Sequence, residues 1–391
     1  MDKRTRRDLV ERAFVARFGG PPSDWLRAPG RVDLMGSHTD YNEGHVLTMS
    51  IDRDTWLAVR PRPDRRVAVA SLDLPGAAEF SLDAIDHDRE VPWSDYVRGA
   101  ARVLIDAGRE LVGFDGLLHS TIPFGSGLSS SAAIEIATLL AFAGTSGISL
   151  DRLHLAELGQ QAENMFVGIS CGILDQYTSV FGTAGHALLL DCREPSSRPV
   201  VLAPHLVTVV CDTRAERHLA ATGYGERRAD CEAGVAILRV HEPGVRALRD
   251  VSPAMLTAHE AELPGRVARR CRFIIEEEAR VLQLAETLPH GNRGTLAALF
   301  GASYDGATRL FEIGAPATAA MHEAMIGAPG FIAGRQAGAG FGGCLVALVE
   351  REAVAPFAAH VERAYAAATG SEAHVFAVAA AQGAGSIEED G

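Results

Sequence analysis

Lysine is almost absent from this sequence of 391 residues: Lys3 is the only one, whereas arginine is abundant. The absence excludes every mechanism that needs a lysine side chain, such as a GxxxxGK[ST] phosphate loop, a Schiff base or the strand lysine of protein kinases. Any phosphate group bound by this protein must therefore be held by backbone amides, hydroxyls, arginine and metal.

Long apolar runs are also missing, and the opening stretch MDKRTRRDLVERAF is charged and amphipathic, without the apolar segment of a signal peptide. We therefore expect a cytoplasmic protein with no membrane partner. The formal net charge of −13 argues against nucleic acid as a partner, because neutralising phosphates needs a basic surface. The six cysteines form no CxxC pair and no zinc-binding spacing, so we expect reduced thiols and no structural metal.

The hydrophobic and charged fractions, 47% and 22%, are those of a globular protein, and the length favours two domains. Apolar residues recur at helical and strand spacing in both halves, which predicts an α+β fold. The expected helices cover residues 7–18, 93–107, 130–143, 151–166, 224–240, 267–287, 293–311 and 353–369. The expected strands cover residues 46–60, 67–71, 116–122, 187–192, 205–211, 344–349 and 373–378. A Pro/Ser-rich stretch at 194–199 is the candidate junction between domains 1–198 and 199–391, and the polar tail after 378 is expected to be mobile.

The segment PFGSGLSSSAA, residues 123–133, places two glycines and four serines between a predicted strand and an apolar helix. The start of a helix offers unpaired backbone N–H groups and the positive end of the helix dipole, and glycines let the backbone approach an anion. Serine hydroxyls add ligands for phosphate or magnesium. A bare GSG would indicate an ordinary turn and N-cap, but this run is denser than a cap requires, which favours phosphate binding.

Four segments together resemble the galactokinase branch of the superfamily that also contains homoserine, mevalonate and phosphomevalonate kinases. They occur in the family's order along nearly the whole chain: APGRVDLMGSHTDYNEG (28–44), PFGSGLSSSAA (123–133), QQAENMFVGISCGILDQ (160–176) and AGAGFGGC (337–344). The resemblance implies two α+β domains with the active site in the cleft between them. It also implies transfer of the ATP γ-phosphoryl group to the anomeric hydroxyl of a galactose-like sugar.

The resemblance also implies roles for individual residues. Asp175 is the catalytic carboxylate and Arg31 neutralises the transferring phosphoryl group, while Glu163 and Ser131 hold Mg²⁺. The sugar is contacted by Ser37, His38, Asp40, Cys171, Gly172 and Tyr224. ATP is contacted by Trp93 and Tyr96 at the adenine, by Gly340, and by the phosphate loop through Gly125, Ser126, Gly127, Leu128, Ser129, Ser130 and Ser131. Sequence spacing alone places Glu163 near the end of a helix and Asp175 in the loop beyond it, an arrangement that is also common on ordinary surface helices.

The sequence departs from the family's pattern at three places. Ser37 stands where a glutamate near carbon 6 of the sugar is usual, Asp33 replaces an asparagine and is expected to pair with Arg31, and Gln336-Ala337 replaces a pair that contains threonine. The first departure leaves open a kinase for a carbon-6 variant such as galacturonate, or for L-arabinose. A second alternative is a catalytically silent galactose sensor, although the phosphate loop and both carboxylates are present. We expect a monomer or a weak homo-oligomer.

Overall fold

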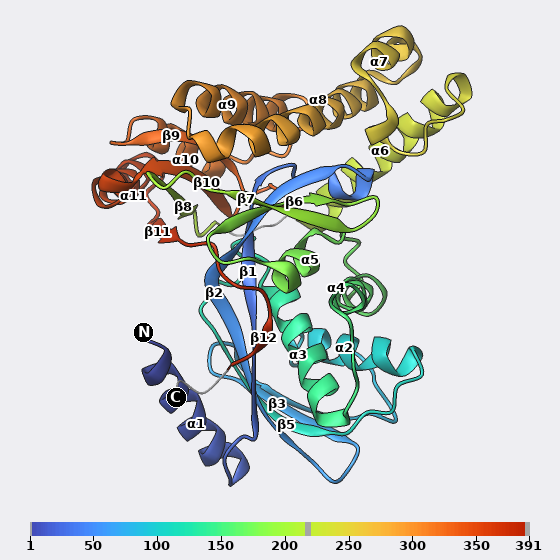
Figure 1. Ribbon diagram of the computed structural model, residues 1–391, viewed down its shortest axis with the longest axis vertical. Coiled ribbons are helices and arrows are strands. Elements are labelled where there is room, and N and C mark those ends of the chain that lie inside the picture. The colour runs from blue at the N-terminus through green and yellow to red at the C-terminus, as the bar shows by residue number, and fades with distance from the viewer. Residues whose placement is uncertain (1, 216–219, 388–391) are drawn as a thin grey trace.

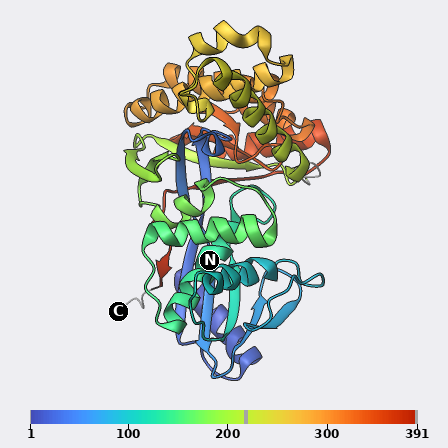
Figure 2. The same ribbon diagram turned by 90° about the vertical axis from the view of Figure 1, so that its right-hand side faces the viewer.

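The computed structural model describes residues 2–215 and 220–387, which form two α+β domains stacked along the long axis of the molecule (Figures 1 and 2). The predicted fold class is therefore confirmed.

The N-terminal domain is built on an eight-stranded sheet, counted over the described residues. The sheet runs in the order β12-β1-β2-β5-β3-β4, with β6 paired to β2 and β7 to β6. All its pairs are antiparallel except β3 with β5. The strands are β1 (Asp24–Met35), β2 (His45–Pro61), β3 (Arg66–Ser71), β4 (Ala77–Ser81), β5 (Phe114–Ser120), β6 (His186–Asp191), β7 (Ser196–Val201) and β12 (Gly385–Ser386). The register between β1 and β2 shifts at Gly30, which makes a bulge directly before Arg31.

Helices cover both faces of this sheet (Figure 1). On one face lies α1 (Lys3–Phe18), whose Val10 and Phe14 pack on Trp25 and Trp56. The other face carries α2 (Ser94–Asp106), α3 (Ser130–Ser146), α4 (Arg152–Gln161), the π-helix η2 (Ala162–Val167) and α5 (Leu174–Phe181). The very apolar α3 lies in the centre of this layer, which explains why it has almost no exposed face.

The C-terminal domain pairs a four-stranded antiparallel sheet, in the order β11-β8-β10-β9, with helices. The strands are β8 (Leu206–Asp212), β9 (Phe331–Gln336), β10 (Cys344–Glu350) and β11 (His374–Val378). The helices are α6 (Ala220–His241), α7 (Pro253–His259), α8 (Gly265–Thr287), α9 (Arg293–Arg309), α10 (Pro316–Ile326) and α11 (Val354–Thr369). Short turns of helix in this domain are η3 (Leu248–Asp250), η4 (Glu260–Glu262), η5 (Leu288–His290) and η6 (Arg351–Ala353), and the N-terminal domain has one, η1 (Asp40–Asn42), between β1 and β2.

Three local expectations change in the structure. Residues 196–199 of the Pro/Ser-rich stretch start β7, and residues 194–195 belong to the turn that joins β7 to β6, so the stretch is part of a hairpin and not an irregular linker. The boundary at 198/199 stays a prediction and falls within this strand. Asp175 lies in the first turn of α5 and not in a loop. Residues 379–387 of the expected mobile tail are ordered, because β12 pairs with β1 and Ile387 packs beside Trp25, and residues 388–391 lie outside the described part of the chain.

Over the described part of the chain, no helix is long and apolar enough to cross a membrane. The six cysteines are all free thiols, and four of them are buried, as expected for small apolar side chains.

Candidate active site

A cavity of about 510 Å³ opens between the two domains and brings the predicted catalytic and sugar-binding residues together. Its lining comes from β1 and the turn after it, from η2 and the loop that follows, from α5, from the start of α6 and from the glycine-rich loop after β9. The predicted residues among its lining are Arg31, Ser37, His38, Asp40, Glu163, Cys171, Gly172, Asp175 and Tyr224.

Arg31 and Asp175 form an ion pair on the wall of the cavity. Arg31 Nε donates to Asp175 Oδ1 at 2.8 Å, and Nη2 lies 2.6 Å from the same oxygen. Arg31 is 5% exposed. Burial alone would lower its pKa, but the nearby Asp175 and Asp33 carboxylates hold the pKa of Arg31 above its ordinary value. Both contacts from Arg31 go to Oδ1, so the other carboxylate oxygen of Asp175 remains to meet a hydroxyl group.

The predicted phosphate loop is held in place by hydrogen bonds that its backbone carbonyl groups accept from the protein. Arg31 Nη1 donates to Gly127 O at 2.7 Å, Arg31 N donates to Leu128 O at 3.1 Å, and Cys344 N donates to Ser126 O at 3.0 Å. A side chain at Gly30 would place its Cβ 2.6 Å from Leu128 O, so glycine is needed for this approach. Ser129 has a positive φ of 60° at the N-cap of α3, and its buried hydroxyl has no hydrogen-bond partner among the described residues.

Ser131, in the first turn of α3, hydrogen-bonds the Glu163 carboxylate, which also accepts from Gln176 Nε2 at 2.7 Å and from Cys171 Sγ at 3.3 Å. Burial and the charge of Asp175 raise the pKa of Glu163. A second carboxylate, Glu135, is fully buried one turn after Ser131 and accepts from the same Gln176 amide at 3.0 Å. The sequence analysis missed Glu135 because it lies in an apolar helix. A hydroxyl and a carboxylate side by side form an oxygen donor set that fits Mg²⁺.

His38 connects the β1 turn to the glycine-rich loop. Its Nε2 donates to Ala339 O at 2.9 Å and its Nδ1 accepts from Tyr41 Oη at 3.0 Å, which is the neutral Nε2–H tautomer. Burial lowers the pKa of His38 to about 4, so the ring is neutral at pH 7. Both ring nitrogens are already engaged with the protein, and the ring packs on Tyr224 with centroids 5.1 Å apart.

Asp40 lies against Gly172, where an added Cβ would come within 1.9 Å of its carboxylate oxygen. Burial, together with the neighbouring Asp175 charge, raises the pKa of Asp40 to about 6. The backbone of the predicted sugar-binding loop therefore packs directly on a carboxylate that faces the cavity.

A buried charge network stands behind this wall and was only partly expected. Asp33 does not take Arg31 as its hydrogen-bond partner: its Oδ1 accepts from Gly338 N at 2.6 Å, its Oδ2 accepts from the Ser37 hydroxyl, and Arg335 Nη1 lies 3.6 Å from Oδ2. Arg335 Nη2 also donates to Ser37 Oγ at 3.1 Å and lies 3.6 Å from Glu277 Oε1. Asp33, Glu277 and Arg335 are all 0% exposed. Sequence reasoning missed Arg335 and Glu277, because only the pairing of distant strands and helices brings them here.

The remaining predicted residues lie outside the cavity. Trp93 precedes α2, and its indole N–H donates to Pro75 O at 2.9 Å. Tyr96 is partly buried on α2, where burial and then the charges of Glu163 and Glu135 raise its pKa. Gly340, with φ of 82°, packs on the Ile313 carbonyl, while the cavity is lined by its neighbours Gly338 and Ala339.

Two family models match the chain. The model described as the GHMP kinases N terminal domain matches residues 95–183, and the galactokinase galactose-binding signature matches residues 12–61. The first segment contains the predicted phosphate loop, η2 and α5, and the second contains β1 with Arg31 and the turn after it.

The chain is also similar to whole proteins of known name. It is 42% identical over 383 residues to a galactokinase of Roseiflexus sp. strain RS-1, covering 98% of this chain and 97% of the relative. The crystal structure of Lactococcus lactis galactokinase complexed with galactose superposes with a TM-score of 0.91 at 30% identity, covering 97% of this chain and 99% of that one. The crystal structure of Methanococcus jannaschii mevalonate kinase shares the fold, with a TM-score of 0.66 at 16% identity over 92% of this chain and 98% of that one.

Proposed function

Since the chain belongs to the galactokinase family of the GHMP kinases and is an ATP-dependent sugar kinase, we propose that it transfers the γ-phosphoryl group of ATP to the anomeric hydroxyl of galactose. The observation that carries this proposal is the Arg31–Asp175 ion pair on the wall of an interdomain cavity, beside the phosphate loop.

In this proposal Asp175 orients the anomeric hydroxyl and receives its proton as the oxygen attacks the γ-phosphorus. Arg31 holds Asp175 Oδ1 and thereby turns the second oxygen of the carboxylate toward the substrate. The Arg31 guanidinium, which also contacts Gly127 O of the phosphate loop, is placed to stabilise charge on the transferring group. The bond from the γ-phosphorus to the bridging oxygen of ADP breaks, and ADP leaves.

ATP is assigned to the loop Gly125–Ser131 and the start of α3. The carbonyls of Ser126, Gly127 and Leu128 are bound within the protein, which supports presentation of the loop's N–H groups to phosphate oxygens. Ser131 and Glu163 would hold Mg²⁺, which when bound supplies positive charge to the phosphate oxygens. Contacts of Trp93 and Tyr96 with adenine, and of Gly340 with ATP, remain predictions.

The sugar is assigned to the cavity floor formed by Asp40, Cys171, Gly172 and Tyr224. Asp40 offers an acceptor to sugar hydroxyls, and Tyr224 an aromatic face. His38 acts here as a positioning residue, because its two nitrogens already connect Tyr41 and Ala339. Ser37 shapes the same wall through Asp33 and Arg335.

The buried network bears on the substrate alternatives. In place of the usual glutamate at position 37, Asp33 provides a carboxylate that lies directly beside Ser37. Arg335 forms an ion pair with this carboxylate. A galacturonate carboxylate would meet Asp33 at close range, which disfavours the uronate relative to neutral sugars. L-Arabinose, which is neutral, is the stronger rival. The silent-sensor alternative has less support, because a relative along nearly the whole chain is named a galactokinase. A cytoplasmic location and a monomer or weak oligomer also remain predictions.

A coupled ADP-release assay with galactose, galacturonate and L-arabinose tests the proposal. We expect the highest kcat/KM for galactose, at least about tenfold above L-arabinose, and the lowest for galacturonate. A higher kcat/KM for either rival would overturn the substrate assignment. Calorimetric binding of galactose and ATP without ADP release would favour the sensor.

A further inference from the structure

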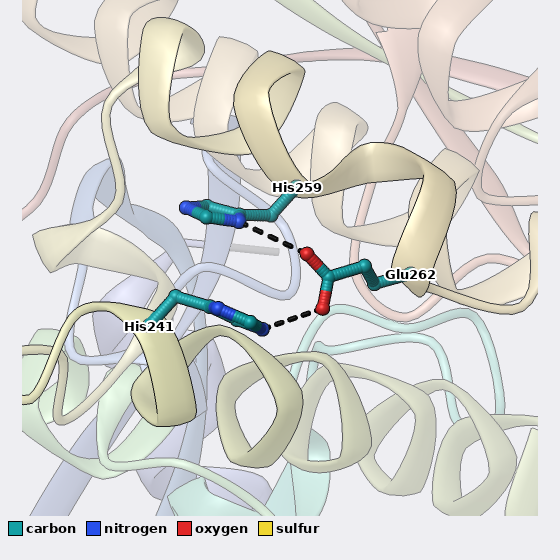
Figure 3. A group of neighbouring side chains, drawn as sticks. All are labelled: His241, His259 and Glu262. Carbon is teal, nitrogen blue, oxygen red and sulfur yellow. Dashed lines mark hydrogen bonds and ion pairs between the residues drawn. The ribbon is translucent and has the colours of Figure 1, made fainter.

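Far from the cavity, two histidines and a glutamate from three different elements converge on the surface of the C-terminal domain (Figure 3). His241 ends α6, His259 ends α7, and Glu262 lies in η4. Each of the three side chains offers one potential metal-ligand atom, and these three atoms lie within 4.8 Å of one another. We propose that this group is a site for a divalent transition metal, and specifically for Zn²⁺.

The two histidines already point at the two oxygens of one carboxylate. His241 Nε2 lies 2.5 Å from Glu262 Oε2, and His259 Nδ1 lies 3.2 Å from Oε1. Ligand atoms about 2.0–2.1 Å from a tetrahedral zinc ion are about 3.3 Å from one another. The 3.2 Å separation between His259 Nδ1 and Glu262 Oε1 already has this size, whereas His241 Nε2 must move away from Glu262 Oε2 to admit the ion.

The three backbone positions are held by the core beneath them. Leu238, three residues before His241, is 0% exposed, and Leu256, three residues before His259, is 2% exposed. Leu263, directly after Glu262, belongs to the same apolar cluster. Because each ligand is one turn or less from a buried leucine, the site does not have to be assembled from mobile segments, and little ordering opposes binding.

The chemistry of the site selects zinc over magnesium. Two imidazoles and one carboxylate are ligands that Zn²⁺ prefers, whereas Mg²⁺ prefers oxygen ligands only. Both histidines lie in the last turn of a helix, where the negative end of the helix dipole attracts a cation. The rings are stacked with centroids 4.4 Å apart and must tilt to direct both nitrogens at one ion. Their side chains are 32% and 21% exposed, so core packing does not prevent this movement.

Bound zinc would fasten the far end of α6 to η4. Tyr224, which lines the sugar cavity, lies on the same helix, 17 residues and thus about 25 Å from His241. The ion would therefore act on stability and not on the reacting groups. The site uses no cysteine, which is why the cysteine spacing in the sequence gave no sign of it.

The test is a titration of the full-length, tag-free chain with ZnCl₂ by calorimetry at pH 7.5, with Mg²⁺ present in excess. Because Mg²⁺ prefers oxygen ligands, it competes for carboxylate and hydroxyl sites and leaves the histidine cluster to zinc. We expect one zinc per chain, a rise in Tm on binding, and a loss of at least about tenfold in affinity for His241→Ala and for Glu262→Gln. His154→Ala is the matched control, because His154 also lies beside one glutamate, Glu157, but has no third ligand in the cluster. His154→Ala should bind zinc as the wild type does.

Two results would overturn the proposal. One is a wild-type chain that binds no zinc, and the other is zinc binding that both cluster variants retain unchanged. Lowering the pH to 5.5 adds an independent check, since protons compete with zinc for imidazole nitrogen and must weaken binding at this site.

Discussion

At the scale of single residues, Asp175 is the carboxylate whose loss should most affect the reaction. Asp175→Asn keeps the shape of the side chain but cannot receive the hydroxyl proton, so kcat should fall by about 10²- to 10⁴-fold with a smaller change in KM for the sugar. The variant also leaves the buried Arg31 without its closest carboxylate, and we expect some loss of thermal stability.

Steady-state kinetics measures the loss of turnover, and calorimetry with galactose reports whether the site still forms. Asp24→Asn, at an exposed position on β1, is the matched control and should behave as wild type. A variant that binds galactose and retains near wild-type kcat would remove Asp175 from the mechanism.

Ser37 and Asp33 should behave as one unit. Ser37→Glu adds a carboxylate beside Asp33 in a region where both residues are almost fully buried, so the single variant should be destabilised by about 3 kcal/mol or more. Adding Asp33→Asn removes the repulsion and should recover most of that loss. Urea unfolding of the two single variants and the double variant gives the coupling energy, and additive effects would show that the two positions do not share a charge site.

Asp40 should make the stability of the protein depend on pH. Its pKa is raised from 3.8 to about 6 in the folded chain, chiefly by burial, so the folded state holds a proton that the unfolded state releases between these values. Above pH 6 the carboxylate is ionised in the folded state, and the cost of burying its charge lowers the free energy of unfolding by its full amount. This cost disappears as the pH falls toward 4, where the folded state holds the proton. Asp40→Asn should accordingly have a higher Tm than wild type at pH 7.5, with the difference shrinking at pH 4.5.

Thermal unfolding of both proteins across this range measures the effect, and galactose titration at pH 7.5 should show that the more stable variant binds the sugar more weakly. A Tm difference that stays constant with pH would contradict the assignment of a raised pKa to Asp40.

At the scale of elements, the loop between η2 and α5 depends on its close contact with Asp40. Gly172→Ala would place a Cβ 1.9 Å from the Asp40 carboxylate, so the loop or the carboxylate must move, and KM for galactose should rise at least about tenfold. Gly225→Ala is the matched control, because Gly225 lines the same cavity but an added Cβ there meets nothing within 4 Å. Equal kinetics for the two variants would show that the contact with Asp40 does not position the sugar.

Sequence periodicity predicted the long amphipathic helices and the regular strands, since α8, α9, β2 and β10 match their expected ranges within a few residues. It failed where tertiary contacts override local preference. The segment 151–166 was expected as one helix, but it passes into the π-helix η2 at Ala162, which turns the buried Glu163 toward Gln176. Strand β1 was not predicted, because Arg31 and Asp33 place charges on a face that points into the cavity.

The four sequence motifs were sufficient to predict many of the residues that line the candidate site. They did not predict the buried residues that support this lining. Glu135, Glu277 and Arg335 lie in segments with no motif, and only the fold places them next to motif residues. A buried charged residue can be identified only together with the residue that it binds. Glu135 binds Gln176, 41 residues away in the sequence, and Arg335 binds Ser37, 298 residues away. Local patterns carry no information on such pairs.

At the scale of the whole molecule, the C-terminal segment closes the N-terminal domain. Residues 379–387 return along α5, where Ala384 N donates to Ser179 O, and end at β12, where Ile387 N donates to Trp25 O. Deleting the chain from residue 379 onward should lower Tm by at least about 5 °C, since it exposes the apolar surface covered by Ile387 and removes these hydrogen bonds.

Scanning calorimetry measures this shift, and Ile387→Ala isolates the apolar part, for which we expect a smaller decrease in the same direction. A truncated chain with the Tm of the full chain would mean that the returning segment contributes no stability.

The same return has a mechanical consequence. Helix α1 at the start of the chain and Ile387 near its end pack into one apolar cluster on the N-terminal sheet. A force applied between residues 3 and 387 is therefore transmitted through α1, the sheet and β12. The segment from β8 to β11 does not bear this force. Pulling in an optical trap should first peel β12 and α1 from the sheet, at low force and with a short gain in length. The catalytic cavity and the C-terminal domain would feel no tension until that first rupture had occurred.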